Sequence, residues 1–222
     1  MKRILAALIL LFTILPTTAW GYVYNEPHTF QSQLETARSK TVRVVLENVE
    51  RYPWATFYSL VTAATGTMIG DGYILTNHHV IDFTHNEIDI ALYDGTITTA
   101  TLIKSDKDKD LALLHIDSTA EGFIFSTTEP YTGQSIMTVG QPTGLPQWSF
   151  SEGVIQSIDQ PATMTTGESY TAIMTDAEVK QGNSGGPLLN ERGELVGIVR
   201  AANVGHSFAV TLEDVKKFLE GI

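Results

Sequence analysis

Three short stretches of the sequence carry residue types that together could perform acyl transfer. The stretch from Gln181 to Pro187 reads Gln-Gly-Asn-Ser-Gly-Gly-Pro and places Ser184 among glycines. Glycines let the backbone turn sharply, so the serine hydroxyl projects outward and neighbouring N–H groups can converge on one point. A serine nucleophile also needs a base that takes its proton and an acid that orients that base. We therefore expect a histidine and a carboxylate elsewhere in the chain.

A histidine and an aspartate stand where such partners are needed. His79 follows a predicted strand that ends in Leu75-Thr76, and an imidazole at that place can accept a proton near neutral pH. Asp110 comes 31 residues later, directly before the apolar run Leu111–Ile116. We expect Asp110 to be ionised beside the imidazole, where it would fix the tautomer of His79 and stabilise the imidazolium.

Two other acids, Asp106 and Asp108, lie close to the expected place. They alternate with lysines, which is typical of an exposed turn, and neither directly precedes the apolar strand. Asp110 is therefore the preferred acid.

The three stretches, in the order His, Asp, Ser, resemble the chymotrypsin-like serine proteases. They are most similar to the cysteine-free bacterial HtrA (Deg) branch, whose motifs read close to TNxHV, DLAL and GNSGG, and the resemblance covers about residue 65 to the C-terminus. It implies an all-β fold of two perpendicular six-stranded antiparallel β-barrels, with the triad in the cleft between them and no cofactor. By the same resemblance His79 is the general base, Asp110 orients it and Ser184 attacks the scissile carbonyl. The N–H groups of Gly182 and Ser184 would form the oxyanion hole.

The sequence departs from relatives of this kind at several points. Asn183 stands where the digestive enzymes have an aspartate, and no Ile-Val-Gly-Gly-like N-terminus exists to pair with it, so activation by N-terminal insertion is not expected. HtrA proteins usually carry PDZ domains after the protease, whereas this sequence runs to Ile222. Their N-terminal part commonly builds a trimer through aromatic contacts. Tyr22, Tyr24 and Phe30 are the candidates for a homotrimer contact here, or they pack on the chain's own surface.

The resemblance also indicates where the side chain before the scissile bond would bind. The candidate pocket residues are Glu178, Ala201, Ala202 and His206. The small alanines leave room for a small aliphatic residue, whereas His206 admits an acidic one as the second choice.

Composition limits the remaining classes of function. A charged start at Lys2 and Arg3, an apolar run from Ile4 to Leu15 and small residues up to Gly21 predict a signal peptide over residues 1–21, with a retained anchor as the alternative. Removing it leaves 201 residues with 12 basic and 25 acidic side chains, a formal charge of −13, which disfavours nucleic acid and anionic lipid as partners.

The sequence has no cysteine, so neither disulfides nor a thiol nucleophile can be present. No later stretch is apolar for long enough to cross a membrane, and we expect an exported protein, periplasmic or secreted.

Hydrophobic periodicity predicts the elements that must position these residues. An N-terminal segment, residues 22–40, contains a short amphipathic helix between Pro27 and Lys40, and the protease domain occupies residues 41–222. Barrel 1 spans about 41–117, barrel 2 about 133–210, and a terminal helix covers 212–221. The predicted strands are rich in β-branched and aromatic residues; they cover 41–49, 57–69, 72–76, 87–93, 96–103 and 111–116, and then 134–140, 148–159, 169–175, 187–190, 195–201 and 207–210.

Two other interpretations use the same residues. A pseudoprotease or binding module could keep the fold without catalysis, although the intact His79, Asp110 and Ser184 argue against it. Alternatively, His78, Asp82 and His85 could share one face of a short helix and bind a divalent metal.

Overall fold

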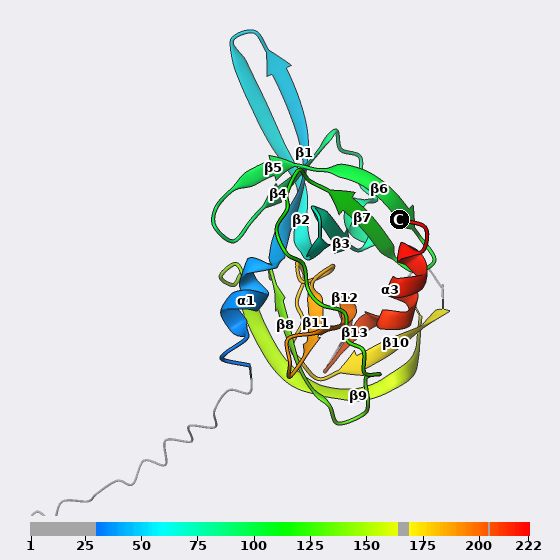
Figure 1. Cartoon of the computed structure of the whole chain (residues 1–222). Coiled ribbons are helices and arrows are strands. Elements are labelled where there is room, and N and C mark those ends of the chain that lie inside the picture. The colour runs from blue at the N-terminus through cyan, green and yellow to red at the C-terminus, as the bar shows by residue number, and fades with distance from the viewer. Residues whose placement is uncertain (1–29, 164–168, 204) are drawn as a thin grey trace, which may run out of the picture.

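Two β-sheet units form the structure, one above the other in Figure 1. The computed structural model describes residues 30–163, 169–203 and 205–222. The first unit is a seven-stranded antiparallel sheet in the order β5-β4-β1-β2-β3-β7-β6. Its strands are β1 (Thr41–Tyr52), β2 (Ala55–Gly70), β3 (Tyr73–Thr76), β4 (Glu87–Ala91), β5 (Ile97–Thr99), β6 (Thr101–Asp106) and β7 (Leu111–His115). The four-residue helix α2 (His78–Ile81) follows β3.

The first sheet curls on itself because its two edge strands are neighbours in sequence. The predicted strand 96–103 is in fact two strands, β5 and β6, separated by Ala100. β5 pairs with β4 at one edge of the sheet, and β6 pairs with β7 at the other. Since one residue joins the two edges, they must meet, and the sheet takes the form of a partly open barrel.

The second unit is a closed six-stranded barrel, as the sequence predicts. Its strands follow the order β10-β13-β12-β11-β8-β9. They are β8 (Ser135–Gly140), β9 (Ser149–Thr163), β10 (Ser169–Thr175), β11 (Pro187–Asn190), β12 (Leu195–Asn203) and β13 (His206–Thr211). The prediction of an all-β fold with two barrel-like units and a C-terminal helix is confirmed.

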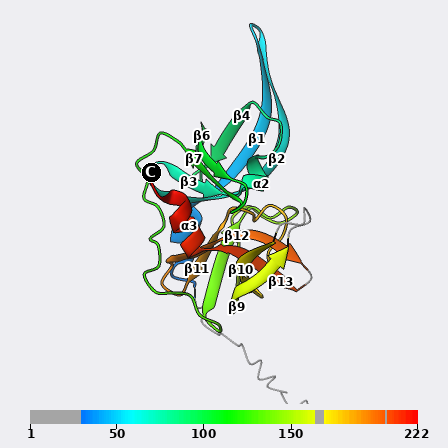
Figure 2. The same cartoon turned by 90° about the vertical axis from the view of Figure 1, so that its right-hand side faces the viewer.

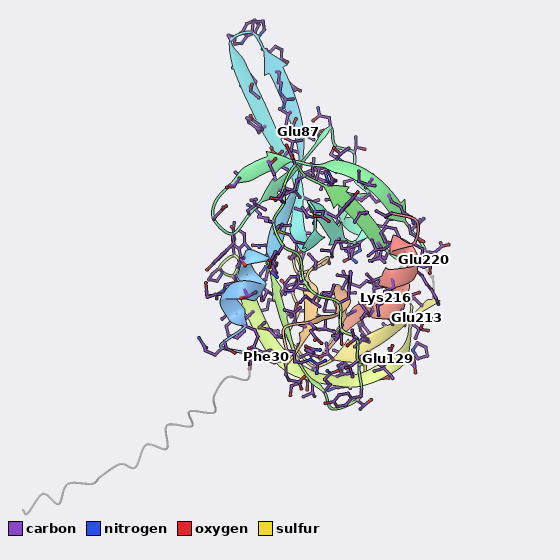
Figure 3. All side chains as sticks on the ribbon, in the orientation of Figure 1. Phe30, Glu87, Glu129, Glu213, Lys216 and Glu220 are labelled. Atoms are coloured by element: carbon purple, nitrogen blue, oxygen red, sulfur yellow. The ribbon has the colours of Figure 1, made fainter. Side chains whose placement is uncertain are left out.

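Two helices close the structure at its sides. α1 (Leu34–Ser39) precedes β1 and is shorter than the predicted segment, whose first residues lie outside the described ones. α3 (Leu212–Leu219) lies beside both units in Figures 1 and 2, and the Lys104 ammonium of β6 donates to the Phe218 carbonyl at 2.6 Å. Figure 3 labels the exposed Glu213 and Lys216 of this helix and Glu220, which directly follows it.

One hydrophobic core contains side chains of both units. It combines side chains of both sheets with those of the two helices: Phe30, Leu34, Ala37, Leu75, Leu111, Leu113, Phe123, Met137, Val139, Leu189, Leu195, Ile198, Val210, Val215 and Phe218. Phe30, labelled in Figure 3, is only 2% exposed and belongs to this core. It therefore does not offer the aromatic contact to another subunit that the sequence allowed, while Tyr22 and Tyr24 lie outside the described residues.

The hairpin of β1 and β2 extends far beyond the first sheet, as Figures 1 and 2 show. Its pairing continues to Tyr52 and Ala55, so both strands are longer than predicted. The tip presents exposed Tyr52, Trp54 and Phe57, and the Tyr52 ring stacks on Trp54 with centroids 5.4 Å apart.

Candidate active site

His79 is held at the end of a buried strand. The last three residues of β3 are buried, and Asn77, the residue between β3 and α2, donates from its side chain to the Asp110 carbonyl at 2.9 Å. This bond ties the start of α2 to the turn that carries Asp110. This arrangement agrees with the sequence prediction that His79 follows the end of a strand.

Asp110 contacts both the backbone and the ring of His79. Its side chain is 1% exposed. Oδ1 accepts the His79 backbone N–H at 2.9 Å, and Oδ2 lies 2.8 Å from His79 Nδ1. A carboxylate accepts hydrogen bonds only, so this contact requires the hydrogen on Nδ1 and leaves Nε2 as the proton acceptor. Asp110 adopts φ 54° in the turn before β7, a left-handed conformation that aspartate tolerates better than most residues.

Arg200 is a functional candidate that the sequence reasoning missed. Its Nε lies 3.1 Å from Asp110 Oδ2, and its side chain is 4% exposed. Its guanidinium lies over the Tyr170 ring, 3.7 Å from the centroid. Burial by itself disfavours an ionised carboxylate, so the expected ionised form of Asp110 needs a counter-charge nearby. Arg200 supplies it, together with the two N–H groups of His79.

Ser184 lies in a loop whose geometry depends on its glycines. Gly182 and Gly185 adopt φ 100° and 85°, and a Cβ at either would overlap a backbone carbonyl, that of Gln141 or of Thr65. The Ser184 carbonyl accepts the Thr65 N–H at 3.0 Å, which fixes the loop against β2. These contacts hold the loop between the two units.

The loop leaves two N–H groups unused within the described part of the chain. Asn183, Gly185 and Gly186 donate their N–H groups to protein carbonyls. Those of Gly182 and Ser184, the two that the resemblance assigns to the oxyanion hole, form no hydrogen bond among the described residues. The Ser184 hydroxyl donates to the Arg200 carbonyl at 3.2 Å and not to His79.

Comparison with known proteins identifies the family. Residues 64–198, more than half of the chain, match the trypsin-like peptidase domain. The chain belongs to the trypsin-like peptidase family. It is 36% identical over 163 residues to the serine protease Do-like HtrA of Bacillus subtilis, covering 68% of this chain and 36% of that protein. It is 41% identical over 133 residues to the serine endoprotease DegS of Haemophilus influenzae, covering 59% of this chain and 38% of the relative.

The other matches agree with an HtrA-like branch of that family. A probable periplasmic serine protease, do/HhoA-like, of Haemophilus influenzae is 32% identical over 160 residues, which cover 68% of this chain and 34% of that protein. The crystal structure of the serine endoprotease from Yersinia pestis superimposes with a TM-score of 0.71 at 32% identity, over 87% of this chain and 66% of the other. The chain spans little more than a third of the length of these curated relatives.

Of the four predicted pocket residues in this trypsin-like peptidase domain, Glu178 borders a small hollow beside the serine loop. This hollow of about 40 Å³ is also lined by Lys180 and Asn183 and by residues of the 142–151 segment. Ala201, Ala202 and His206 lie on the β12–β13 hairpin, where Ala202 pairs with Ser207, and none of them borders that hollow. Their role in specificity stays a prediction.

Neither competing acid is seen to contact His79, and of the three proposed metal ligands only two come together, His78 Nε2 lying 3.9 Å from Asp82 Oδ2. Asp106 pairs with Lys109 at 3.6 Å within its own turn, and Asp108 is exposed. α2 ends at Ile81, so it does not extend to His85; the His85 ring contacts the Phe83 carbonyl instead. No group of three potential ligands that could hold a metal occurs among residues 30–163, 169–203 and 205–222. Over the same residues, no helix is long and apolar enough to cross a membrane.

Proposed function

We propose that the chain is a serine endopeptidase that hydrolyses peptide bonds through an acyl-enzyme on Ser184. The observation that carries this proposal is the contact of Asp110 with His79 Nδ1 at 2.8 Å, together with a serine loop in which the N–H groups of Gly182 and Ser184 form no hydrogen bond among the described residues. The relatives named as serine proteases support the same chemistry.

The reaction would begin with a rotation of the Ser184 hydroxyl away from the Arg200 carbonyl toward His79. Catalytic hydrogen bonds are often absent in a free enzyme and form only with substrate, so the resting bond to Arg200 is compatible with activity. His79 Nε2 would take the hydroxyl proton as Oγ attacks the scissile carbonyl carbon, and Asp110 would stabilise the imidazolium. The N–H groups of Gly182 and Ser184 would bind the oxyanion, His79 would protonate the leaving amine, and water would release the acyl group by the same steps.

Polypeptides are the proposed substrates, and no cofactor is required for these steps. The side chain before the scissile bond would be small and aliphatic, with an acidic one as the second choice. Export follows from the predicted leader over residues 1–21, with the mature chain starting at Tyr22 and the protease domain at residue 41. A homotrimer would have to use Tyr22, Tyr24 or other surfaces, because Phe30 is buried.

A binding module without activity is the second candidate. The hydrogen bond of Ser184 to Arg200 rather than to His79 favours it, because a permanently misplaced hydroxyl could not react. The two candidates differ in whether bound polypeptide is cut.

Digestion of a denatured protein mixture with the wild type and with Ser184→Ala tests the proposal. New peptide termini read by mass spectrometry should appear with the wild type alone, and their sequences would give the preference at the cleaved bond. Covalent labelling of Ser184 by a fluorophosphonate would show an activated hydroxyl independently. Identical digests and an unlabelled Ser184 would favour the binding module.

A further inference from the structure

We propose that Arg200 is a positioning residue that extends the activity toward acid pH by sharing the carboxylate of Asp110 with His79. The inference deepens the proposed function and rests on it for its kinetic readout. The Arg200 carbonyl accepts the Ser184 hydroxyl, whereas its side chain lies on Asp110 and acts through that carboxylate.

The geometry places one carboxylate between two groups that can be cationic. Asp110 Oδ2 lies 2.8 Å from His79 Nδ1 and 3.1 Å from Arg200 Nε. Asp110 and Arg200 are 1% and 4% exposed, whereas the His79 side chain is 39% exposed. The carboxylate and the guanidinium are thus both buried and face each other. The imidazole is the exposed partner that gains or loses a proton.

The surroundings of Arg200 keep the guanidinium on the carboxylate. The Tyr170 ring of β10 lies against its face, and burial raises the pKa of the Tyr170 hydroxyl, so this neighbour is neutral at ordinary pH. Asp108, Lys109 and Asp214 border a hollow of about 250 Å³ next to Arg200. These neighbours persist in a variant at position 200.

The consequence for protonation follows from the sign of the charges. A carboxylate alone stabilises a neighbouring imidazolium, but a guanidinium on the same carboxylate offsets part of that attraction. The imidazole of the wild type therefore gives up its proton at a lower pH than it would without Arg200. Since only the neutral imidazole can act as general base, the guanidinium keeps the base available in more acidic medium.

The kinetic test compares the pH profiles of kcat/KM for the wild type, Arg200→Gln and Arg200→Lys. We expect the acid limb of Arg200→Gln to lie on the order of one pH unit higher than that of the wild type, because a neighbouring charge shifts a titration by about that amount. Its activity relative to the wild type should then fall about tenfold further on the acid limb than on the alkaline plateau. Arg200→Lys restores the charge and should return most of the shift.

A matched control separates this effect from general damage. Arg192→Gln removes an arginine that pairs with Glu194 in the exposed turn after β11, and its acid limb should coincide with that of the wild type. A merely structural role of Arg200 would lower kcat/KM by one factor at every pH. An acid limb of Arg200→Gln that coincides with the wild type, or one that Arg200→Lys does not restore, would overturn the proposal.

A readout without turnover keeps the inference testable if the proposed function fails. The His79 ring resonances of the full chain can be followed by NMR against pH and assigned by their loss in His79→Gln. The titration midpoint should be about one pH unit higher in Arg200→Gln than in the wild type. Equal midpoints would refute the role of Arg200, whereas a wild type that cuts no polypeptide but shows the shift would refute only the endopeptidase.

Discussion

Replacing Gly182 by alanine should abolish most of the activity while leaving the fold in place. Gly182 adopts φ 100°, and an added Cβ would overlap the Gln141 carbonyl oxygen. Because that oxygen belongs to the backbone, the Gly182 peptide itself must move, and its N–H would leave the predicted oxyanion hole. Loss of one such donor costs about 3 kcal/mol of transition-state stabilisation, or 10²–10³-fold in kcat. A left-handed conformation costs an alanine about 1–2 kcal/mol of stability in addition.

Gly133→Ala is the matched control for this prediction. Gly133 adopts φ 89° in the turn before β8, and nothing lies within 4 Å of a Cβ built there. It should lose the same 1–2 kcal/mol, a fall of about 2–8 °C in Tm, and keep its activity. The assay is kcat/KM on a peptide that the wild type cuts, together with thermal denaturation. A Gly182→Ala variant within tenfold of the wild-type kcat would refute the assignment of its N–H to the oxyanion.

Three further predictions concern stability, each measured as a free energy of unfolding in denaturant. Glu194 has its pKa lowered to about 2 by hydrogen bonds from the Arg192 guanidinium and the Asn190 amide. This carboxylate stabilises the fold above pH 4.5 and loses that contribution as the pH falls toward 2, so Glu194→Gln should lose less stability than the wild type between pH 5 and 3. Thr211→Ala removes the side chain that accepts the Asp214 N–H at the start of α3 and should cost about 1 kcal/mol. Phe218→Ala opens the shared core, where the ring is 2% exposed, and should cost about 3–5 kcal/mol.

Most of the fold could be predicted because the strands carry a strong local signal. The barrel 2 strands end within a few residues of their predicted bounds, and β7 coincides with an apolar run whose first four residues are buried. The division of 96–103 into β5 and β6 could not be predicted. Ala100 turns the chain from one edge of the sheet to the other through its N–H bond to the Ile88 carbonyl, a contact set by closure of the sheet. The β-propensity of the residues from 96 to 103 does not predict a hydrogen bond to a distant residue such as Ile88.

The β1–β2 hairpin is longer than the strand pattern predicts for a related reason. Glu50, Arg51 and Pro53 indicate the end of a strand, yet pairing continues through Glu50 and Arg51 to Tyr52. Cross-strand aromatic contacts help to explain this extension, since Tyr52 packs edge to face on Phe57 with ring centroids 5.9 Å apart. Such contacts depend on residues of both strands, so the sequence of either strand alone does not predict them.

In the candidate site, too, residues in local motifs could be predicted from the sequence, whereas a residue placed by long-range packing could not. His79 and Asp110 lie within recognisable local motifs, and their contact was expected. Arg200 carries no local signal, because an arginine in an apolar strand of alternating pattern reads as an outward side chain. Only the packing of β12 beside the turn that carries Asp110 turns it inward and buries it.

Arg200 contacts both Asp110 and Ser184, the predicted acid and the predicted nucleophile, through two different parts of one residue. Its carbonyl accepts the Ser184 hydroxyl at 3.2 Å, while its guanidinium lies 3.1 Å from Asp110. The backbone also joins this strand to the serine loop, since the Gly185 N–H donates to the Val199 carbonyl at 2.9 Å. A shift of β12 at Arg200 would therefore change the orientation of the hydroxyl and the charge around His79 together. Asn183 predicts that N-terminal insertion does not control the proposed activity, so we expect such control at the position of β12 relative to the serine loop.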